Sequence, residues 1–226
     1  LVNILDGHNV RNKFWQVSDK KIISMLVDLM KHKKIFIADG HHRYEVGLAF
    51  SKFKKDPKYG YMLTYFTDLL GDGLVVLPYH RLIGGLDKDA LLALEASLNK
   101  NFITKPLKSK KDLKDFLAKA KPTEARFVIY WQKRFTGLIF KDKIDLDVTI
   151  AKNLIIDPLQ KIFIDFTKDL DYAIKEVNSS KFSFAILVNP VKITEIRDVA
   201  FLGSRMPQKS TYFYPKVLTG LVINVF

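Results

Sequence analysis

The segment that decides the predicted fold is Ile35-Phe36-Ile37-Ala38-Asp39-Gly40-His41-His42-Arg43-Tyr44-Glu45. Its first four residues form an apolar run that predicts a short buried strand, and Asp39 to His42 read as a turn. Apolar residues then recur at helical spacing, at positions 46, 49, 50 and 53, and Asp56-Pro57 ends the pattern. The segment therefore predicts a strand, a turn and a helix in immediate succession.

Similar patterns extend in both directions from this segment. A helix N-capped by Ser18 is expected to run to Met30, on the apolar stripe at Ile22, Ile23, Leu26, Leu29 and Met30. Further strands are expected at 61–66, 74–77, 102–104, 182–188 and 221–226, a hairpin at 127–131 and 136–140, and helices at 87–98, 110–120, 193–200 and, interrupted at Pro158, over most of 150–178. This order predicts an α/β to α+β fold, with a mixed sheet and helices packed on it.

The length of 226 residues suits one domain or two tightly packed lobes. Gly84-Gly85 and the loop at 121–123 are the positions where a seam is expected, near 84–86 or 121–123. The pattern contains no internal repeat and no low-complexity linker.

The composition excludes several classes of site. The chain has no cysteine, which rules out disulfides, thiolate metal sites and cysteine nucleophiles. No run of about 18 apolar residues is present, so no membrane span is expected. The first residues do not have the pattern of a signal peptide. We therefore expect a cytoplasmic protein.

The net charge of +13 suggests an anionic partner. The excess of Lys and Arg is spread along the chain among Asp and Glu, which is also typical of a solvated surface. This spread weakens the case for nucleic acid, although an anionic ligand and nucleic acid both stay open, and so does the oligomeric state.

The turn at Asp39 to Glu45 carries the densest group of reactive side chains. Gly40 permits a positive φ, and the amides of the following helix attract an anion. Arg43 offers a fork for phosphate, His41 and His42 titrate near neutrality, and Glu45 is placed to orient His41. Asp39 could be a base. The alternative is structural, because Asp-Gly is common turn chemistry and Asp39 could only cap a helix.

Asp39, His41, His42 and His80 could supply nitrogen and oxygen ligands to a metal ion. Adjacent histidines rarely point at one ion, and no His-x-x-x-His spacing is present. We assign no metal ligands.

Two further segments combine basic and polar residues. His80 and Arg81 follow an apolar strand, and Lys209, Ser210, Thr211 and Lys216 lie among the aromatic residues 212–214. These residues could bind phosphate, or they could be a strand exit and a loop braced by Pro207 and Pro215. Lys209-Ser210-Thr211 lacks the upstream glycines of a P-loop.

Three blocks, residues 37–45, 73–82 and 206–216, resemble the hallmark segments of domain-of-unknown-function family ten-fifteen, which is sometimes labelled ParB-like. The resemblance adds His80, Arg81 and the block at 206–216 to the expected site. It also implies that the chain corresponds to the C-terminal portion of longer members, whose N-terminal half is absent here. The turn itself resembles the phosphate-contacting strand–loop–helix of the ParB, sulfiredoxin and free-serine-kinase superfamily.

The leading hypothesis is an enzyme-like domain that binds a nucleotide or another phosphorylated small molecule, as a phosphotransferase or nucleotide hydrolase. Asp39 or His41 would act as general base, with His42 as a further catalytic candidate. Gly40, Arg43, His80, Arg81, Lys209, Ser210, Thr211 and Lys216 would bind the ligand. Mg²⁺ is expected if a nucleoside triphosphate is used. The rival is a ParB-like nucleic-acid-binding or regulatory module without catalysis, which requires a continuous basic face over Lys105 to Lys121.

Overall fold

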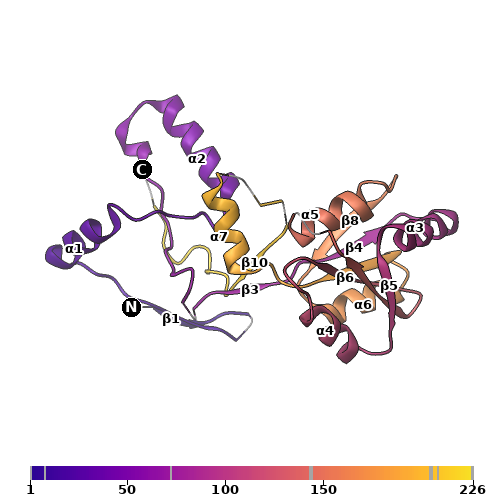
Figure 1. Ribbon diagram of the computed structural model, residues 1–226. Coiled ribbons are helices and arrows are strands. Elements are labelled where there is room, and N and C mark those ends of the chain that lie inside the picture. The colour runs from indigo at the N-terminus through magenta and orange to yellow at the C-terminus, as the bar shows by residue number, and fades with distance from the viewer. Residues whose placement is uncertain are drawn as a thin grey trace. The chain divides into compact units, whose positions relative to one another are not determined.

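The computed structural model describes residues 2–7, 9–71, 73–142, 145–203, 206–207 and 209–224. The chain divides into two compact units (Figure 1). The first unit contains residues 1–66 together with 216–226, and the second contains residues 67–215. The positions 84–86 and 121–123, where the sequence suggests seams, both lie inside the second unit.

The second unit is built on a six-stranded sheet in the order β5-β7-β6-β9-β4-β8. Every neighbouring pair of its strands is antiparallel. The strands are β4 (His80–Gly84), β5 (Ile103–Leu107), β6 (Ala125–Trp131), β7 (Arg134–Phe140), β8 (Phe163–Thr167) and β9 (Phe184–Val188).

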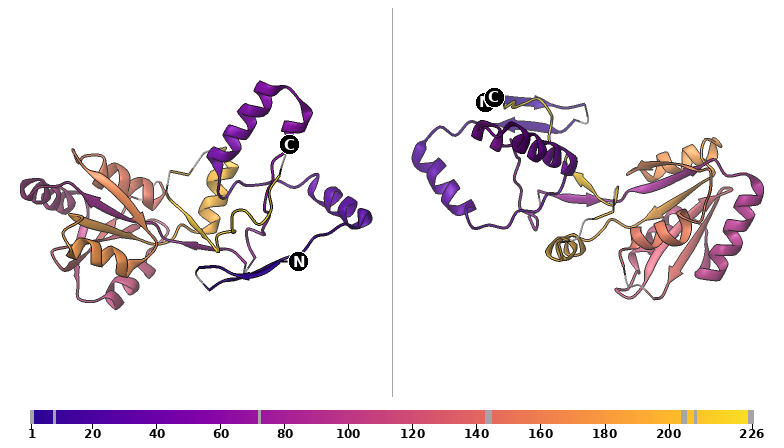
Figure 2. Two further views of the ribbon diagram at one scale, coloured as in Figure 1. Left: turned by 180° about the vertical axis from the view of Figure 1, so that it is seen from behind. Right: turned by 90° about the horizontal axis from the view of Figure 1, so that it is seen from above.

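Helices cover both faces of this sheet (Figure 2). They are α3 (Lys88–Asn101), α4 (Lys110–Ala118), α5 (Asp147–Ala151), the π-helical turn η2 (Lys152–Ile156) and α6 (Leu170–Asn178). Their apolar residues form two separate clusters with the strands: α3, α5 and η2 contribute to one, and α4 and α6 contribute to the other.

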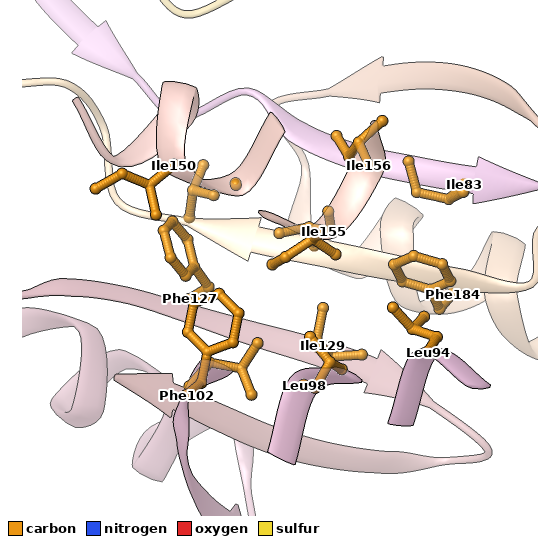
Figure 3. Packing of buried hydrophobic residues seen from close by; sticks show 14 of the residues in the cluster. Ile83, Leu94, Leu98, Phe102, Phe127, Ile129, Ile150, Ile155, Ile156 and Phe184 are labelled. Atoms are coloured by element: carbon orange, nitrogen blue, oxygen red, sulfur yellow. The ribbon is translucent and has the colours of Figure 1, made fainter. Parts of the chain in front are cut away.

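Alternate residues of strand β6 belong to the two apolar clusters on opposite faces of the sheet. Phe127 and Ile129 belong to the cluster with α3, α5 and η2, which Figure 3 shows from close by. Val128 and Tyr130 belong to the cluster with α4 and α6. Successive side chains of a strand point to opposite faces, so a continuous apolar run is what a sheet covered on both faces requires.

The remaining elements of the second unit lie outside this sheet. Strand β3 (Val75–Leu77) pairs antiparallel with β10 (Tyr212–Tyr214), and Leu77 lies opposite Tyr212. Helix α7 (Ile193–Phe201) begins at a capping box in which the Glu195 carboxylate accepts a hydrogen bond from the Lys192 amide.

The first unit contains little regular structure, and its hydrophobic side chains are more exposed than those of the second unit. Its elements are the hairpin β1 (Val2–Leu5) and β2 (Arg11–Phe14), helices α1 (Lys20–Met30) and α2 (His41–Lys54), and the 3₁₀ turn η1 (Pro57–Gly60). The described part of this unit contributes no buried hydrophobic side chain, and Phe53 is 78% exposed. No described helix is long and apolar enough to cross a membrane.

The expected class is confirmed at the level of an α+β fold, while the expected mixed sheet is wrong because all its pairings are antiparallel. The hairpin at β6 and β7 and the helices α1, α2, α3, α4 and α7 occur close to where the sequence places them. Asp19, rather than Ser18, caps α1, since its carboxylate accepts from the amides of Lys21 and Ile22.

Other expected elements are wrong or were missed. The segments 35–38 and 61–66 are not strands, and neither are the described residues 221–224 of the expected last strand; residues 225–226 lie outside the described part. Both 35–38 and 61–66 have apolar residues, but neither segment belongs to a sheet of the described structure. Apolar composition alone does not make a strand, because a strand requires ladder hydrogen bonds with a neighbouring strand. Conversely, β8 lies within the segment expected to be mainly helical, as an edge strand paired with β4.

Candidate functional site

The turn before α2 is built on a glycine in the left-handed region. Gly40 has a φ of 84° and a ψ of 28° and occupies the N-cap position of α2. Its carbonyl accepts the first helical hydrogen bond, from the Tyr44 amide at 3.0 Å. Because residues with a Cβ rarely adopt this conformation, the turn depends on glycine at this position.

Asp39 is fixed at both oxygens. Its Oδ1 accepts a hydrogen bond from the Gly40 amide at 2.8 Å, and its Oδ2 accepts one from Lys216 Nζ, also at 2.8 Å. Lys216 belongs to the same unit as the turn, although it comes from the last part of the chain. The contact therefore joins two segments that the sequence singled out independently.

The charge of Asp39 follows from these neighbours. Partial burial acts to raise the pKa of the carboxyl group, but the hydrogen bond and charge of Lys216 oppose it. The Gly40 amide and the charge of Arg43 act in the same direction as Lys216, and the pKa ends below its usual value of 3.8. Asp39 is therefore a carboxylate at neutral pH and a weak proton acceptor.

Arg43 packs back onto the turn. A Cβ placed on Gly40 would lie 2.9 Å from Arg43 Nη2 and 3.0 Å from its Nε, so the guanidinium lies directly against the glycine. The first amides of a helix have no partner within the helix and attract negative charge. The Arg43 guanidinium and the Lys216 ammonium thus both lie next to the turn at Asp39 and Gly40, where α2 begins.

The two histidines lie in the first turn of α2 and are exposed. His42 Nδ1 lies 3.7 Å from Glu45 Oε2, and the His42 side chain is 84% exposed. The sequence predicts that Glu45 orients His41, whereas the structure shows its contact with His42, one position further along the helix. His41 follows Gly40 directly and is the imidazole nearest to the turn in sequence.

His80 of the second unit lies inside the sheet, and its role in phosphate binding stays a prediction. It is buried in β4, and its Nδ1 accepts a hydrogen bond from the Val188 amide of β9 at 3.3 Å. Burial lowers the pKa of His80 to about 4; the charge of Arg81 acts in the same direction, and Asp169 opposes it. A neutral imidazole at pH 7 does not supply the positive charge that the predicted phosphate contact calls for.

Arg81, the next residue, is also buried. Its Nη1 donates to the Tyr79 carbonyl at 3.1 Å, and its guanidinium lies 5.8 Å from the centre of the Phe166 ring. Burial lowers the pKa of Arg81 to about 10. Arg81 therefore remains a cation at neutral pH, in a poorly solvated place.

The block at 206–216 is divided between the units. Lys209, with a φ of 56°, places its Nζ 5.8 Å from the centre of the Tyr79 ring. The buried Ser210 hydroxyl donates to the Pro207 carbonyl, which ties the loop together, and Thr211 is half-buried just before β10. These three residues belong to the second unit, whereas Lys216 belongs to the first.

Of the predicted site residues, the structure brings together Asp39, Gly40, Arg43 and Lys216, with His42 beside Glu45. A second group gathers around Tyr79 in the other unit, from Arg81 and Lys209. Each group lies within its own unit. Sequence patterns missed Lys168, whose Nζ lies over the rings of Tyr212 and Tyr214 at 4.8 and 5.1 Å. The signal for Lys168 is its place directly after β8, a strand that the sequence did not reveal.

The described residues contain no group of three or more His, Asp or Glu side chains arranged to hold a metal ion. At the turn, the Asp39 carboxylate is already engaged by the Lys216 ammonium. The turn therefore does not fit a Mg²⁺ ion held by the protein alone, which usually takes one or two carboxylates together with substrate phosphates.

The family described as "Protein of unknown function (DUF1015)" matches residues 1–171. The chain belongs to this family. The turn at Asp39 to Glu45 and the segment with His80 and Arg81 lie within the matched part of this DUF1015 protein, and the block at 206–216 lies beyond it. No match was found among curated proteins.

Solved structures also resemble the DUF1015 chain. A free serine kinase, in a mutant form and in complex with AMP, is 15% identical with a TM-score of 0.50, over 88% of this chain and 82% of that one. A conserved hypothetical protein from Pyrococcus furiosus is 14% identical with a TM-score of 0.49, over 86% of this chain and 83% of that one. At this level of identity the likeness to the kinase concerns the fold.

Proposed function

We propose that this protein binds a nucleotide or another phosphorylated small molecule at the turn formed by Asp39 to Glu45. The observation that carries the proposal is the Arg43 guanidinium packed against the left-handed Gly40, beside the carboxylate that Lys216 holds. A planar guanidinium binds phosphate oxygens through two parallel hydrogen bonds, and the amino end of α2 adds further donors. The similar fold of a free serine kinase in complex with AMP supports a nucleotide as the ligand.

We further propose that the chemistry is phosphoryl transfer to an acceptor or to water. In this scheme Arg43 and Lys216 stabilise charge on the phosphoryl oxygens, since catalysis of such transfers rests on positioning and electrostatics. Asp39 has a lowered pKa and is engaged by Lys216, so it positions Lys216 rather than accepting a proton. The general-base role falls to His41, the imidazole that follows Gly40 directly in the first turn of α2. Any Mg²⁺ would arrive with the phosphates of a triphosphate.

Binding tests this proposal first. AMP, ADP and ATP are titrated into the full chain by calorimetry, and the affinity of Arg43→Ala is compared with that of Lys52→Ala. Lys52 is an exposed cation in the last turn of the same helix, which makes it a matched control for loss of one charge. We expect Arg43→Ala to weaken binding by about tenfold or more and Lys52→Ala to change it little. Equal affinities of the two variants, or no binding by the wild type, would overturn the site.

Catalysis is tested separately, by phosphate release from the nucleotide that binds. We expect His41→Gln to lower kcat by roughly 10²- to 10⁴-fold, the usual contribution of a general base, while nucleotide affinity is retained. A His41→Gln variant with unchanged kcat would remove the base assignment and leave the binding proposal standing.

The nucleic-acid alternative draws no support from the Lys105 to Lys121 segment. Lys110 of α4 is paired with Asp171, and the helix also carries Asp112 and Asp115. The expected basic face is therefore interrupted by acidic groups.

A further inference from the structure

The second unit contains a buried cation, Arg81, that forms no ion pair with any described residue. Arg81 is only 3% exposed, and it lies opposite Phe166 in the antiparallel pair of β4 and β8. Its guanidinium has five N–H donors. Among the described residues, it donates one hydrogen bond, from Nη1 to the Tyr79 carbonyl.

Such an arrangement is costly in a protein interior. Buried charges are normally paired, because only an opposite charge or a full set of hydrogen bonds offsets the free-energy cost of removing the charge from water. Burial lowers the pKa of Arg81, as expected for a cation that has left water. An anion from outside the chain would supply the interaction that the fold does not.

Two lysines extend the positive charge beside Arg81. Lys168 follows β8, two residues after Phe166, and its Nζ lies over the rings of Tyr212 and Tyr214. Lys209 Nζ lies over the ring of Tyr79. Within the described part of the chain, neither lysine forms an ion pair with a carboxylate.

The aromatic rings connect these cations into one group. Tyr79 contacts Phe166 with ring centres 6.0 Å apart and Tyr212 with ring centres 5.4 Å apart, both edge to face. Strand register supports the grouping in part, because Arg81 and Phe166 are direct cross-strand neighbours. Tyr79 directly precedes β4, and Lys168 directly follows β8. We call this group the cationic–aromatic cluster: Arg81, Lys168, Lys209, Tyr79, Phe166 and Tyr212.

We propose that the cationic–aromatic cluster is a second anion site, and that its ligand is the phosphate group of a phosphorylated small molecule. Arg81 provides the fork for two phosphate oxygens, and Lys168 and Lys209 provide the additional charge. Three cations favour a phosphate dianion or a diphosphate over a single carboxylate, and the rings offer an apolar wall for the organic part of the ligand. The site lies wholly in the second unit and stands whether or not the turn at Asp39 binds a ligand.

The experiment uses the full chain with Arg43→Ala, so that the proposed turn no longer contributes. Inorganic pyrophosphate and acetate are titrated into this background and into versions that also carry Arg81→Lys, Lys168→Met or Lys175→Met. Met retains most of the apolar stem of Lys, and Lys175, an exposed cation on α6, is the control. Lys168→Met keeps the test decisive if replacing the buried Arg81 impairs folding, which circular dichroism reports.

We expect pyrophosphate to bind the Arg43→Ala background. Arg81→Lys and Lys168→Met should each weaken that binding by about tenfold, and Lys175→Met should not. Pyrophosphate binding that disappears with Arg43→Ala would place the anion at the turn alone and overturn the second site. Unchanged affinity in Lys168→Met would do the same. Acetate binding as tightly as pyrophosphate would overturn the assignment to phosphate. Loss of nucleotide binding in Arg43→Ala bears only on the turn, so the two proposals fail separately.

Discussion

Lys216 Nζ donates a hydrogen bond to Asp39 Oδ2 at 2.8 Å, although 177 residues separate the two along the chain. The contact assembles the proposed phosphate-binding turn from both ends of the sequence. It also fixes a carboxylate in its charged form beside Gly40 and Arg43. Its consequences can be measured without knowledge of the ligand.

The first prediction concerns the ionisation of Asp39. Its pKa, followed by NMR of the side-chain carboxyl, should lie below 3.8 in the folded protein and rise in Lys216→Met. Because the folded pKa is lowered, the stabilisation is present above the unfolded pKa and is lost as the pH falls through the folded value. An unchanged pKa in Lys216→Met would show that the hydrogen bond does not form in solution.

The second prediction concerns the conformation of Gly40. Gly40→Ala should reduce the stability of the first unit by about 1 kcal/mol, since alanine is strained at a φ of 84°. Gly60→Ala is the control, because a Cβ there meets nothing within 4 Å. Urea denaturation followed by the fluorescence of Trp15, in a Trp131→Phe background, reports on this unit. Equal stability of the two alanine variants would contradict the assigned turn.

The third prediction concerns the buried His80. Its folded pKa of about 4 lies below the usual 6.5, so only the unfolded chain takes up this proton between these values. Stability from this residue is complete above pH 6.5 and is lost as the pH falls towards 4, by roughly 3 kcal/mol in total. His80→Gln should flatten that pH dependence, whereas replacement of the exposed His42 by Gln should not. Identical pH profiles for wild type and His80→Gln would refute the buried, neutral histidine.

The fourth prediction concerns the packing between α4 and β7. A Cβ on Gly137 would lie 2.8 Å from the Phe116 ring, and Phe116 is buried. Gly137→Ala should therefore destabilise the second unit by about 1–3 kcal/mol through overpacking. Gly73→Ala, where the added Cβ meets nothing within 4 Å, should be nearly neutral. Trp131 fluorescence in a Trp15→Phe background provides the measurement.

The fifth prediction compares the two units. The described part of the first unit has no buried hydrophobic side chain, whereas the second unit has two apolar clusters. Burial of apolar surface is the main source of stability, so the first unit should open at lower urea concentration than the second. Amide exchange should likewise be faster in α2 than in β6. A single coincident transition, reported by both tryptophans, would argue against this difference.

Local patterns predicted most helices, because their caps and apolar spacing are properties of a short segment. The helices expected at 87–98 and 110–120 correspond to α3 and α4, which the structure shows to be capped by Asp87 and Ser109 through hydrogen bonds from the amides of Ala90 and Asp112. The continuous apolar runs at β6 and β9 also predicted strands correctly. The direction of pairing was not predictable, since it depends on how distant segments meet.

The site was predicted unevenly for the same reason. Gly40 and Arg43 lie three residues apart, so their turn could be expected from local chemistry. The partner of Asp39 could not, because nothing in either segment specifies a contact with Lys216. The burial of Arg81 and its neighbour Phe166 depended on β8, whose residues 163–167 were expected to be helical. Lys168, which directly follows β8, was not predicted as a site residue for the same reason.

The chain order of the two units also affects how the protein is made. Residues 67–215 are inserted between the two segments that form the first unit. During synthesis, the whole second unit therefore leaves the ribosome before Lys216 does, and it can fold while Asp39 still lacks its ammonium partner. The turn at Asp39 is therefore completed last, which delays assembly of the proposed site until nearly all of this sequence has been translated.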